Sequence, residues 1–434
     1  MVDVSPIRVS IQTFGCRVNQ YDSEMMRDLL APTCHITDED PDVVLLNACT
    51  VTALAERKAR QAARRMRRQY PNARVVVIGC LADAVDQGTT QFPDADLLAG
   101  NSWKSQVDQV VQRAMSGMCG TIRAAPLPKL SAERTHGPQD RIRAFLKIQD
   151  GCERACTYCR ATQVRGLPRS KPLEDAVSEA QDLLAAGFPE IVLTGIDLAQ
   201  YSFAGRCLAD VVDAIAPLDG LQRLRLASIN PSGITPGLIE ACAGHKVVSP
   251  HFHISLQSGD DRILADMRRG YDSQQYLDAI QRIRSRIPHA TFGTDIIVGF
   301  PGEDEAAFSN TWHLVQAIGY TNLHVFRYST RPGTAAATFP SQIPSEVKQR
   351  RAGWLVAHWH ESLGSVLDNR IGSTQDVLVE EHRNDGWRGY THDYLYVRFS
   401  SDQQLPIGSI RPVHITTRTD ATLQGVTDHR IDAC

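Results

Sequence analysis

The sequence predicts an α/β protein with an N-terminal parallel doubly wound sheet, a central incomplete (β/α)6 barrel and a small C-terminal antiparallel β-barrel. Three observations predict this fold. Short apolar runs alternate with helical segments near the N-terminus, a second alternation adds six strand–helix units, and strand-like runs after residue 366 follow one another without helices. We expect domains at 1–118, 141–365 and 366–434, with a linker at 119–140.

In the first part, three apolar runs rich in β-branched residues have the composition of buried parallel strands. The runs are Val9–Ile11, Val43–Leu46 and Val75–Ile78. A cysteine follows each run closely, namely Cys16, Cys49 and Cys80. Because ligands bind beyond the carboxyl ends of strands in open α/β sheets, these thiols could converge on one site. Cysteines are also common in cores, but their repetition at one structural position favours a site.

The central part shows six strand candidates separated by helical segments, fewer than the eight units of a full barrel. The candidates are Ala144–Ile148, Glu190–Thr194, Leu221–Ser228, His251–Leu256, Thr291–Val298 and Asn322–Arg327. Three further strands, Asp376–Glu380, Tyr394–Phe399 and Pro412–Thr416, are punctuated by glycines. This last pattern is typical of the small β-barrels that bind oligonucleotides.

The sharpest motif is the C-x3-C-x2-C spacing of Cys152, Cys156 and Cys159. Three thiolates can hold three irons of a 4Fe–4S cluster and leave the fourth iron open. The open iron can bind the amino and carboxylate groups of S-adenosylmethionine, whose reductive cleavage makes a radical. A structural zinc site would need four closed ligands, and the next cysteine is the distant Cys207. The motif also follows the first barrel strand, on the face where barrel active sites lie.

Polar groups near the ends of the barrel strands are candidates for contacts with S-adenosylmethionine. The candidates are Tyr158, Thr194, Gly195, Asp197, Ser228 and Gln257. Glycine lets a ligand approach the backbone, and a carboxylate such as Asp197 can accept from an ammonium group. Each alone is more typical of turn chemistry, but together on one face they favour a binding site.

Composition limits how the protein can meet nucleic acid. The net charge is −3, so an RNA contact requires a local basic patch. The predicted helix 51–70 supplies one, and its candidate RNA-binding residues are Arg57, Arg60, Arg64, Arg67 and Arg68. A solvated helix face is the alternative interpretation of this charge run.

The sequence favours a cytoplasmic protein without membrane segments. No apolar run has the length of a membrane span, and the N-terminus lacks the basic and apolar regions of a secretory signal. Clustered cysteines in a reducing compartment indicate metal binding or catalysis more often than disulfides.

The motifs resemble those of the methylthiotransferases of the radical S-adenosylmethionine superfamily over nearly the whole chain. The matching segments are 13–24 (TFGCRVNQYDSE), 47–52 (NACTVT), 79–80 (GC), 147–152 (KIQDGC), 250–259 (PHFHISLQSG) and 295–303 (DIIVGFPGE). The C-terminal segment resembles a TRAM domain.

The resemblance implies a second 4Fe–4S cluster on Cys16, Cys49 and Cys80, which carries the sulfur to be inserted. One S-adenosylmethionine would methylate that sulfur, and a second would yield a 5′-deoxyadenosyl radical that attacks an unreactive aromatic C–H. Such a C–H is not acidic enough for general-base chemistry. The resemblance also implies a flavodoxin-type or ferredoxin-type electron donor and the tRNA anticodon loop as partners. The sulfur donor stays unassigned.

The family has branches that differ in substrate. GCRVNQY at residues 15–21 resembles the GCKVNQY of the branch acting on threonylcarbamoyladenosine at tRNA position 37. The isopentenyladenosine branch tends to show GCQMN, and the branch acting on a ribosomal-protein aspartate tends to show GCPKN. We therefore favour the first branch and keep the other two as alternatives. A non-catalytic iron–sulfur or zinc RNA-binding protein is the alternative from another functional class.

Two features depart from the family pattern. The family commonly has Ile-Ile-Pro after the third cysteine of the catalytic motif, whereas this chain has Arg160-Ala161-Thr162. Such a change in the loop over the cluster can alter its potential or the fit of the substrate. In addition, residues 366–430 contain seven basic and nine acidic residues, a poor electrostatic match for RNA.

Overall fold

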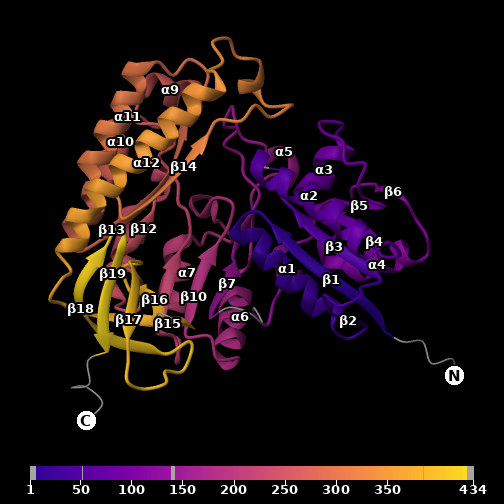
Figure 1. The fold of residues 1–434 in the computed structure, drawn as a ribbon, viewed down its shortest axis with the longest axis horizontal. Helices are drawn as coiled ribbons and strands as arrows, with labels where there is room; N and C mark the ends of the chain where they lie inside the picture. Colours follow the sequence, from indigo (N-terminus) through magenta and orange to yellow (C-terminus); the bar gives the residue numbers. More distant parts are fainter. Residues whose placement is uncertain (1–5, 51, 138–141, 385, 428–434) are drawn as a thin grey trace.

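The N-terminal part is a six-stranded parallel sheet with helices on both faces, as the sequence predicts (Figure 1). The computed structural model describes residues 6–50, 52–137, 142–384 and 386–427. The strand order is β2 (Cys34–Ile36), β1 (Ile7–Phe14), β3 (Val43–Ala48), β4 (Arg74–Ile78), β5 (Leu97–Ala99) and β6 (Gly120–Ile122). Helices α1 (Arg17–Leu30) and α4 (Val107–Met115) pack on one face, and α2 (Ala53–Gln69) and α3 (Cys80–Asp86) pack on the other.

The central part is the predicted incomplete barrel, built from two three-stranded parallel sheets. Their strands are β7 (Arg143–Lys147), β10 (Glu190–Thr194), β11 (Arg223–Leu226), β12 (His251–His253), β13 (Thr291–Val298) and β14 (Asn322–Arg327). Parallel bridges from Leu224 to Val248 and from Ile229 to Ile254 join the two sheets. The outer helices are α6 (Leu173–Ala185), α7 (Leu208–Ile215), α8 (Pro236–Gly244), α10 (Ser273–Arg286) and α11 (Glu305–Ile318).

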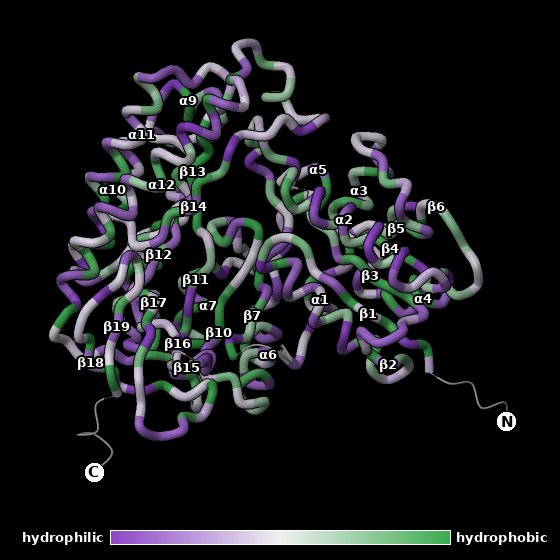
Figure 2. Tube along the Cα trace, viewed as in Figure 1, coloured by the Kyte–Doolittle hydropathy of each residue, from purple (hydrophilic) through white to green (hydrophobic). Residues whose placement is uncertain are grey.

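Smaller elements complete the barrel. Short strands β8 (Gln149–Asp150) and β9 (Arg169–Ser170) pair beside the first strand, and α5 (Ala161–Arg165) and α9 (Asp261–Asp266) are short helices. The 24-residue helix α12 (Ser345–Asp368) packs on α11 and β14, and then leads into the C-terminal part. Figure 2 shows hydrophobic residues along the strands inside each part. None of the described helices combines the length and apolar composition needed to cross a bilayer.

The C-terminal part is a closed five-stranded barrel, which confirms the predicted architecture. Its strands are β15 (Thr374–Arg383), β16 (Gly386–Thr391), β17 (Tyr396–Ser400), β18 (Ile410–Thr419) and β19 (Thr422–Thr427). Its pairs are antiparallel except for β17 and β19, which pair in parallel. The sequence pattern missed β16 and β19 because glycines inside them were read as turns. At Gly389 a side chain would meet the Leu378 carbonyl oxygen at 1.9 Å, so glycine here allows close strand approach.

The segment predicted as a linker is partly structured. Residues Gly120–Ile122 form the edge strand β6, which is too short for a periodicity to reveal. Glu133 and Thr135 are buried against the neighbouring domains. Residues 138–140 of the predicted linker and Val51 of the predicted helix lie outside the described residues.

Gly389→Ala is expected to lower the free energy of unfolding by roughly 1–3 kcal/mol, because the added methyl group overpacks the barrel wall. Gly353→Ala is the matched control, since Gly353 is exposed in α12 with no atom within 4 Å of the added carbon. Alanine should stabilise that helix by up to about 1 kcal/mol. Chemical unfolding of both variants measures the difference, and equal effects would contradict the close-approach argument.

Candidate active site

The Cys152, Cys156 and Cys159 loop lies beyond the carboxyl end of β7, the face at which barrel enzymes place their chemistry. It begins at Gly151, whose φ of +79° and close approach to the Leu167 carbonyl oxygen require glycine. Ala155, between the first two cysteines, also has a positive φ of 51°. A non-glycine residue in this region is strained, which is typical of functional loops.

Each sulfur of this loop accepts an N–H hydrogen bond. The pairs are Gln200 Nε2 to Cys152 at 3.2 Å, Arg269 Nη1 to Cys156 at 3.3 Å, and the Ala161 amide to Cys159 at 3.4 Å. Donors aimed at sulfur favour the thiolate that a metal cluster requires. The sequence reasoning missed Arg269, which comes from a turn after α9 and carries no local signal.

Burial acts against these thiolates when no metal is bound. It raises the pKa of the Cys152 thiol, and it raises the pKa of the Cys159 thiol to about 12. Both thiols are therefore protonated at neutral pH, and a metal must displace the protons to bind.

The second set of cysteines lies at the carboxyl ends of three adjacent strands. Cys16 follows β1, Cys49 follows β3, and Cys80 opens α3 after β4. Gly15 has a φ of +127°, and a side chain there would meet Cys49 Cβ at 2.4 Å. Asn101 Nδ2 donates to Cys80 Sγ at 3.4 Å. Asn101 follows β5, so the strand-end rule applied to the cysteines could have found it.

The two sets of cysteines suit a cluster better than a single ion. Zn–S bonds of about 2.3 Å in a tetrahedral site place ligand sulfurs roughly 4 Å apart. Among the described residues, the sole group of three candidate ligands within 4.8 Å of one another is His253, Asp295 and His324. Neither cysteine set is that compact, as expected for sulfurs that bind different irons of one cluster.

The His253, Asp295 and His324 group lies inside the barrel and was missed by the sequence reasoning. Asp295 Oδ1 is 3.4 Å from His253 Nε2 and 3.0 Å from His324 Nδ1. Burial would raise the pKa of Asp295, but hydrogen bonds from the two rings hold it well below its usual value. The carboxylate is already satisfied by the imidazoles, so the group is a polar wall of the barrel interior.

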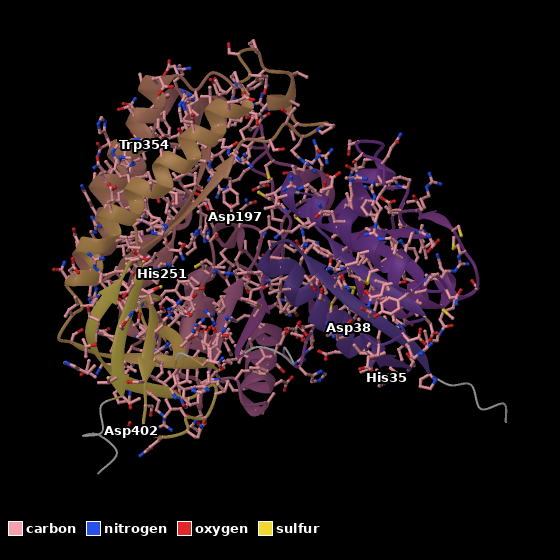
Figure 3. All side chains as sticks on the ribbon, viewed as in Figure 1. His35, Asp38, Asp197, His251, Trp354 and Asp402 are labelled. Carbon is pink, nitrogen blue, oxygen red and sulfur yellow. The ribbon has the colours of Figure 1, made fainter. Side chains whose placement is uncertain are left out.

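Two of the residues predicted to contact S-adenosylmethionine also contact other protein groups. Asp197 accepts hydrogen bonds from Arg154 and Gln200 (labelled in Figure 3). Gly195 is needed for packing, because a side chain there would meet Gln149 Oε1 at 2.9 Å.

The other four predicted residues lie at or beyond the carboxyl ends of barrel strands. Tyr158 Oη lies 3.3 Å from Arg269 Nη1, and Thr194 is buried at the end of β10. Ser228 Oγ lies 2.9 Å from His253 Nδ1. Gln257 is buried with a φ of +73°, a strained conformation next to β13.

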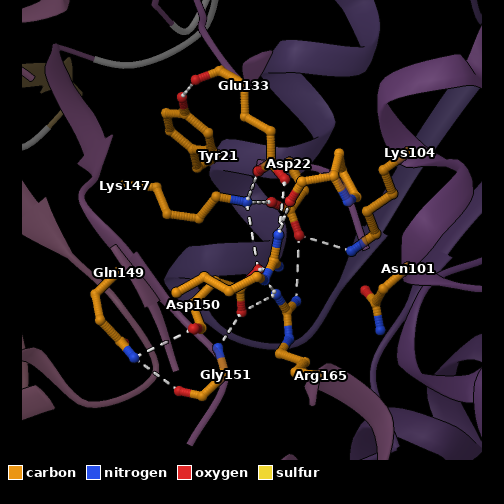
Figure 4. A network of polar contacts seen from close by, with 12 residues as sticks. Tyr21, Asp22, Asn101, Lys104, Glu133, Lys147, Gln149, Asp150, Gly151 and Arg165 are labelled. Carbon is orange, nitrogen blue, oxygen red and sulfur yellow. Dashed lines mark hydrogen bonds and ion pairs between the residues drawn. The ribbon is translucent and has the colours of Figure 1, made fainter. Parts of the chain in front are cut away.

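A buried charge network lies between the N-terminal part and the barrel (Figure 4). Asp22 of α1 pairs with Lys104 at 2.6 Å, with Arg165 of α5 at 3.2 Å, and with Lys147 of β7. Burial would raise the pKa of Asp22, and these three cations hold it well below its usual value. Arg165 also pairs with Asp150 at 3.0 Å. The network therefore connects the N-terminal domain directly to the barrel.

Helix α5 spans the space between the cysteine sites. It starts just after Cys159, and its residue Val164 packs on Cys80. Five residues at a rise of 1.5 Å each cover about 8 Å. The two sites are thus separated by roughly one short helix.

The arginine-rich helix α2 divides into paired and unpaired residues. Arg60 pairs with Glu56, Arg64 with Asp94 and Arg67 with Asp96. These three arginines support the alternative to RNA binding, in which the helix face is solvated and its charges are paired within the protein. Arg57 and Arg68 are exposed and make no ion pair with the described residues, so they keep the interpretation as RNA contacts.

A cavity of about 710 Å³ occupies the barrel interior where all three parts meet. Arg17 and Gln20 of α1 line it, as do Phe145 of β7 and Tyr394 of the C-terminal part. Arg17 is the residue directly after Cys16, and the sequence reasoning quoted it without assigning a role. Cys16 itself is not among the residues that line the cavity, but its neighbour Arg17 is.

Comparisons with known proteins agree with this geometry. Residues 146–315 match the radical SAM superfamily, and residues 8–100 match the uncharacterized protein family UPF0004. The chain is 34% identical to the tRNA-2-methylthio-N(6)-dimethylallyladenosine synthase of Pelotomaculum thermopropionicum, over 96% of each chain. It is 31% identical to the threonylcarbamoyladenosine tRNA methylthiotransferase MtaB of Thermotoga maritima, over 98% of this chain and 97% of that one.

A solved structure shares the fold. The radical S-adenosylmethionine methyltransferase TsrM of Kitasatospora setae superposes with a TM-score of 0.56 at 14% identity, covering 77% of this chain and 75% of that one.

Lys147→Met should lower the free energy of unfolding by about 3–5 kcal/mol, because it leaves Asp22 and Glu133 buried without one of their cations. Arg286→Met is the control. Its pair with Glu240 is largely exposed, so we expect a change of at most about 1 kcal/mol. Denaturant unfolding of the iron-free proteins measures both. A Lys147 variant as stable as the control would show that the network does not hold the interface.

Proposed function

Because the chain belongs to the radical S-adenosylmethionine methylthiotransferase family, we propose that it adds a methylthio group to carbon 2 of threonylcarbamoyladenosine at position 37 of tRNA. Relatives named for this nucleoside and for the dimethylallyl nucleoside are similarly identical to the chain. The choice between them rests on the chemistry of the barrel cavity.

The family uses S-adenosylmethionine and 4Fe–4S clusters, and the residues of this chain suit both clusters. In the proposal Cys152, Cys156 and Cys159 hold the catalytic cluster. The set after β1, β3 and β4, namely Cys16, Cys49 and Cys80, holds the auxiliary one. When bound, these groups supply a reductively generated radical and a sulfur atom. The hydrogen bonds from Gln200, Arg269 and Asn101 orient the sulfurs that would hold the clusters.

The electrostatics of the cavity carry the choice of substrate. Burial would raise the pKa of the Tyr394 phenol, but Arg143 and Arg17 outweigh burial and lower it. Burial, followed by the charge of Arg225, lowers the pKa of His251 well below its usual value. The more acidic phenol reports positive charge close to Tyr394, whereas the neutral imidazole of His251 reports chiefly burial. Positive charge at this position favours an anionic substituent.

Among the described residues, Arg17 is the cation of this cavity that forms no ion pair. Arg143 pairs with Glu380 at 2.7 Å, and Arg225 pairs with Glu190 at 2.7 Å. Arg17 makes no ion pair with the described residues, although it is only partly exposed. A partly desolvated guanidinium gains most from a bidentate carboxylate.

The two candidate nucleosides differ in the substituent that would contact Arg17. The threonylcarbamoyl group ends in a carboxylate and carries a hydroxyl, whereas the dimethylallyl group is a hydrocarbon. A hydrocarbon would cover the partly exposed Arg17 without offering it an acceptor, and desolvating that cation would cost free energy. The substituent leaves the purine from C6, so it projects away from the C2–H that must face the cysteine sites.

The partners in this proposal are a tRNA anticodon loop and a small electron donor of the flavodoxin or ferredoxin type. Arg57 and Arg68 remain available for the tRNA backbone. A non-catalytic RNA-binding protein would not cleave S-adenosylmethionine, so formation of 5′-deoxyadenosine after dithionite reduction excludes that class.

Anaerobic reconstitution of the full chain should yield about eight irons per molecule, because two cysteine sets each hold a 4Fe–4S cluster. A variant with Cys16, Cys49 and Cys80 changed to Ala should keep about four irons and still form 5′-deoxyadenosine. Iron assay and nucleoside chromatography measure both quantities. A wild-type protein with only four irons would remove the auxiliary cluster and the sulfur insertion.

The substrate is tested with two tRNAs that carry threonylcarbamoyladenosine or isopentenyladenosine at position 37. Mass spectrometry of the digested nucleosides should show the methylthio product at least tenfold faster from the first. Equal or reversed rates would contradict the choice of nucleoside while leaving the methylthiotransferase chemistry intact.

A matched pair of variants connects that preference to the cavity. Arg17→Gln should reduce the rate with threonylcarbamoyladenosine at least tenfold, chiefly through KM, and should narrow the preference. Arg68→Gln removes an equally unpaired cation from α2 and should leave the preference unchanged. If Arg17→Gln keeps the preference for threonylcarbamoyladenosine, residues other than Arg17 must cause that preference.

A further inference from the structure

Arg160 is a buried arginine directly after the third cysteine of the catalytic motif. Only 1% of Arg160 is exposed, and the residue immediately precedes helix α5. Arginine is rarely this buried unless its donors are satisfied.

The guanidinium connects three segments that are distant in sequence. Nη1 donates to the Thr50 hydroxyl at 3.0 Å, and Nε donates to the Pro332 carbonyl at 3.0 Å. Nη2 donates to the same carbonyl at 2.5 Å and to the Thr89 carbonyl at 3.4 Å. Thr50 directly follows Cys49. One side chain therefore joins the neighbour of a catalytic cysteine to the neighbour of an auxiliary cysteine.

A second guanidinium holds the same threonine. Arg331 Nη2 donates to the Thr50 carbonyl at 2.7 Å and to its hydroxyl at 2.8 Å. Arg331 also pairs with Glu56, which pairs in turn with Arg60. Burial would raise the pKa of Glu56, and the hydrogen bonds from Arg60 and Arg331 instead lower it to about 2. The single carboxylate of this group is thus fully ionised and shared by two arginines.

The charge of Arg160 has no carboxylate of its own. Its acceptors among the described residues are the Thr50 hydroxyl and two backbone carbonyls, none of which is charged. Glu56, the carboxylate of this group, forms its ion pairs with Arg331 and Arg60 rather than with Arg160. A buried cation without a counter-ion requires an anion nearby. When bound, clusters on the two cysteine sets would supply net negative charge through Cys159, next to Arg160, and Cys49, next to Thr50.

We propose that Arg160 is a positioning residue that clamps the auxiliary cysteine site to the catalytic one through Thr50, and that its charge stabilises the reduced state of the adjacent cluster. The guanidinium limits how far the Cys49 loop can move from Cys159, and so sets the relative placement of the two clusters. A nearby positive charge raises a cluster's reduction potential, because reduction adds negative charge. This role does not depend on which nucleoside is modified.

The test uses reconstituted, reduced full-length protein and two spectroscopic readouts. One is the magnetic interaction between the two reduced clusters in electron paramagnetic resonance spectra, which depends on their separation and orientation. The other is the midpoint potential of the catalytic cluster. Arg160→Ile should change the magnetic interaction and make the potential more negative. Arg160→Lys keeps the charge without the guanidinium fork, so it should restore the potential but not the interaction.

Two further variants complete the design. Thr50→Val, nearly isosteric, removes the shared hydroxyl and should change the interaction even if Arg160→Ile does not fold. Gln163→Ala is the control. It removes a different contact between α5 and the same loop, the 2.6 Å bond from Gln163 to the Gly333 carbonyl, and should leave both readouts at wild-type values. The proposal is overturned if Thr50→Val and every folded Arg160 variant keep the wild-type magnetic interaction.

Discussion

The buried contact between Asp22 and its three cations is the constraint on which the rest of the site depends. Lys104, Lys147 and Arg165 come from the first domain, from β7 and from α5, and all are almost inaccessible to water. A buried ion pair adds little net stability, but separating its members leaves uncompensated charge in a medium of low dielectric constant. The domains are therefore held in one arrangement, because other arrangements would leave these charges without their partners.

That arrangement places α1 against the barrel, and the chemistry follows from it. Cys16 and Arg17 sit at the start of α1, so the network on Asp22 sets where an auxiliary cysteine and the unpaired guanidinium meet the barrel interior. Helix α5 completes the connection, since it begins beside Cys159 and ends at Arg165. In the proposed function, sulfur delivery and radical formation would take place at the two cysteine sets that these elements hold near each other. Short distances and exclusion of water both favour reactions of radicals.

Positive charge recurs at each functional position, although the chain as a whole is slightly acidic. Arg269 donates to a catalytic cysteine, Arg165 lies beside the auxiliary ones, and Arg160 bridges the two sets. Arg17 faces the cavity. Cationic side chains near thiolates lower the cost of burying negative sulfur. The proposed preference for an anionic substituent would draw on the same positive charge.

The sequence by itself determined the elements whose signals are local. Apolar runs marked the strands, and cysteines directly after them predicted two cysteine sites, because residues at the ends of adjacent parallel strands must gather at one edge. The local pattern was wrong at β16, where Gly389 serves strand packing, and it did not reveal that Arg154 donates to Asp197. Only the tertiary structure decided that Arg17 faces Tyr394, that Arg269 reaches Cys156 and that Arg160 reaches Thr50. Those contacts join residues about a hundred or more positions apart, and the packing of domains, rather than any local periodicity, brings them together.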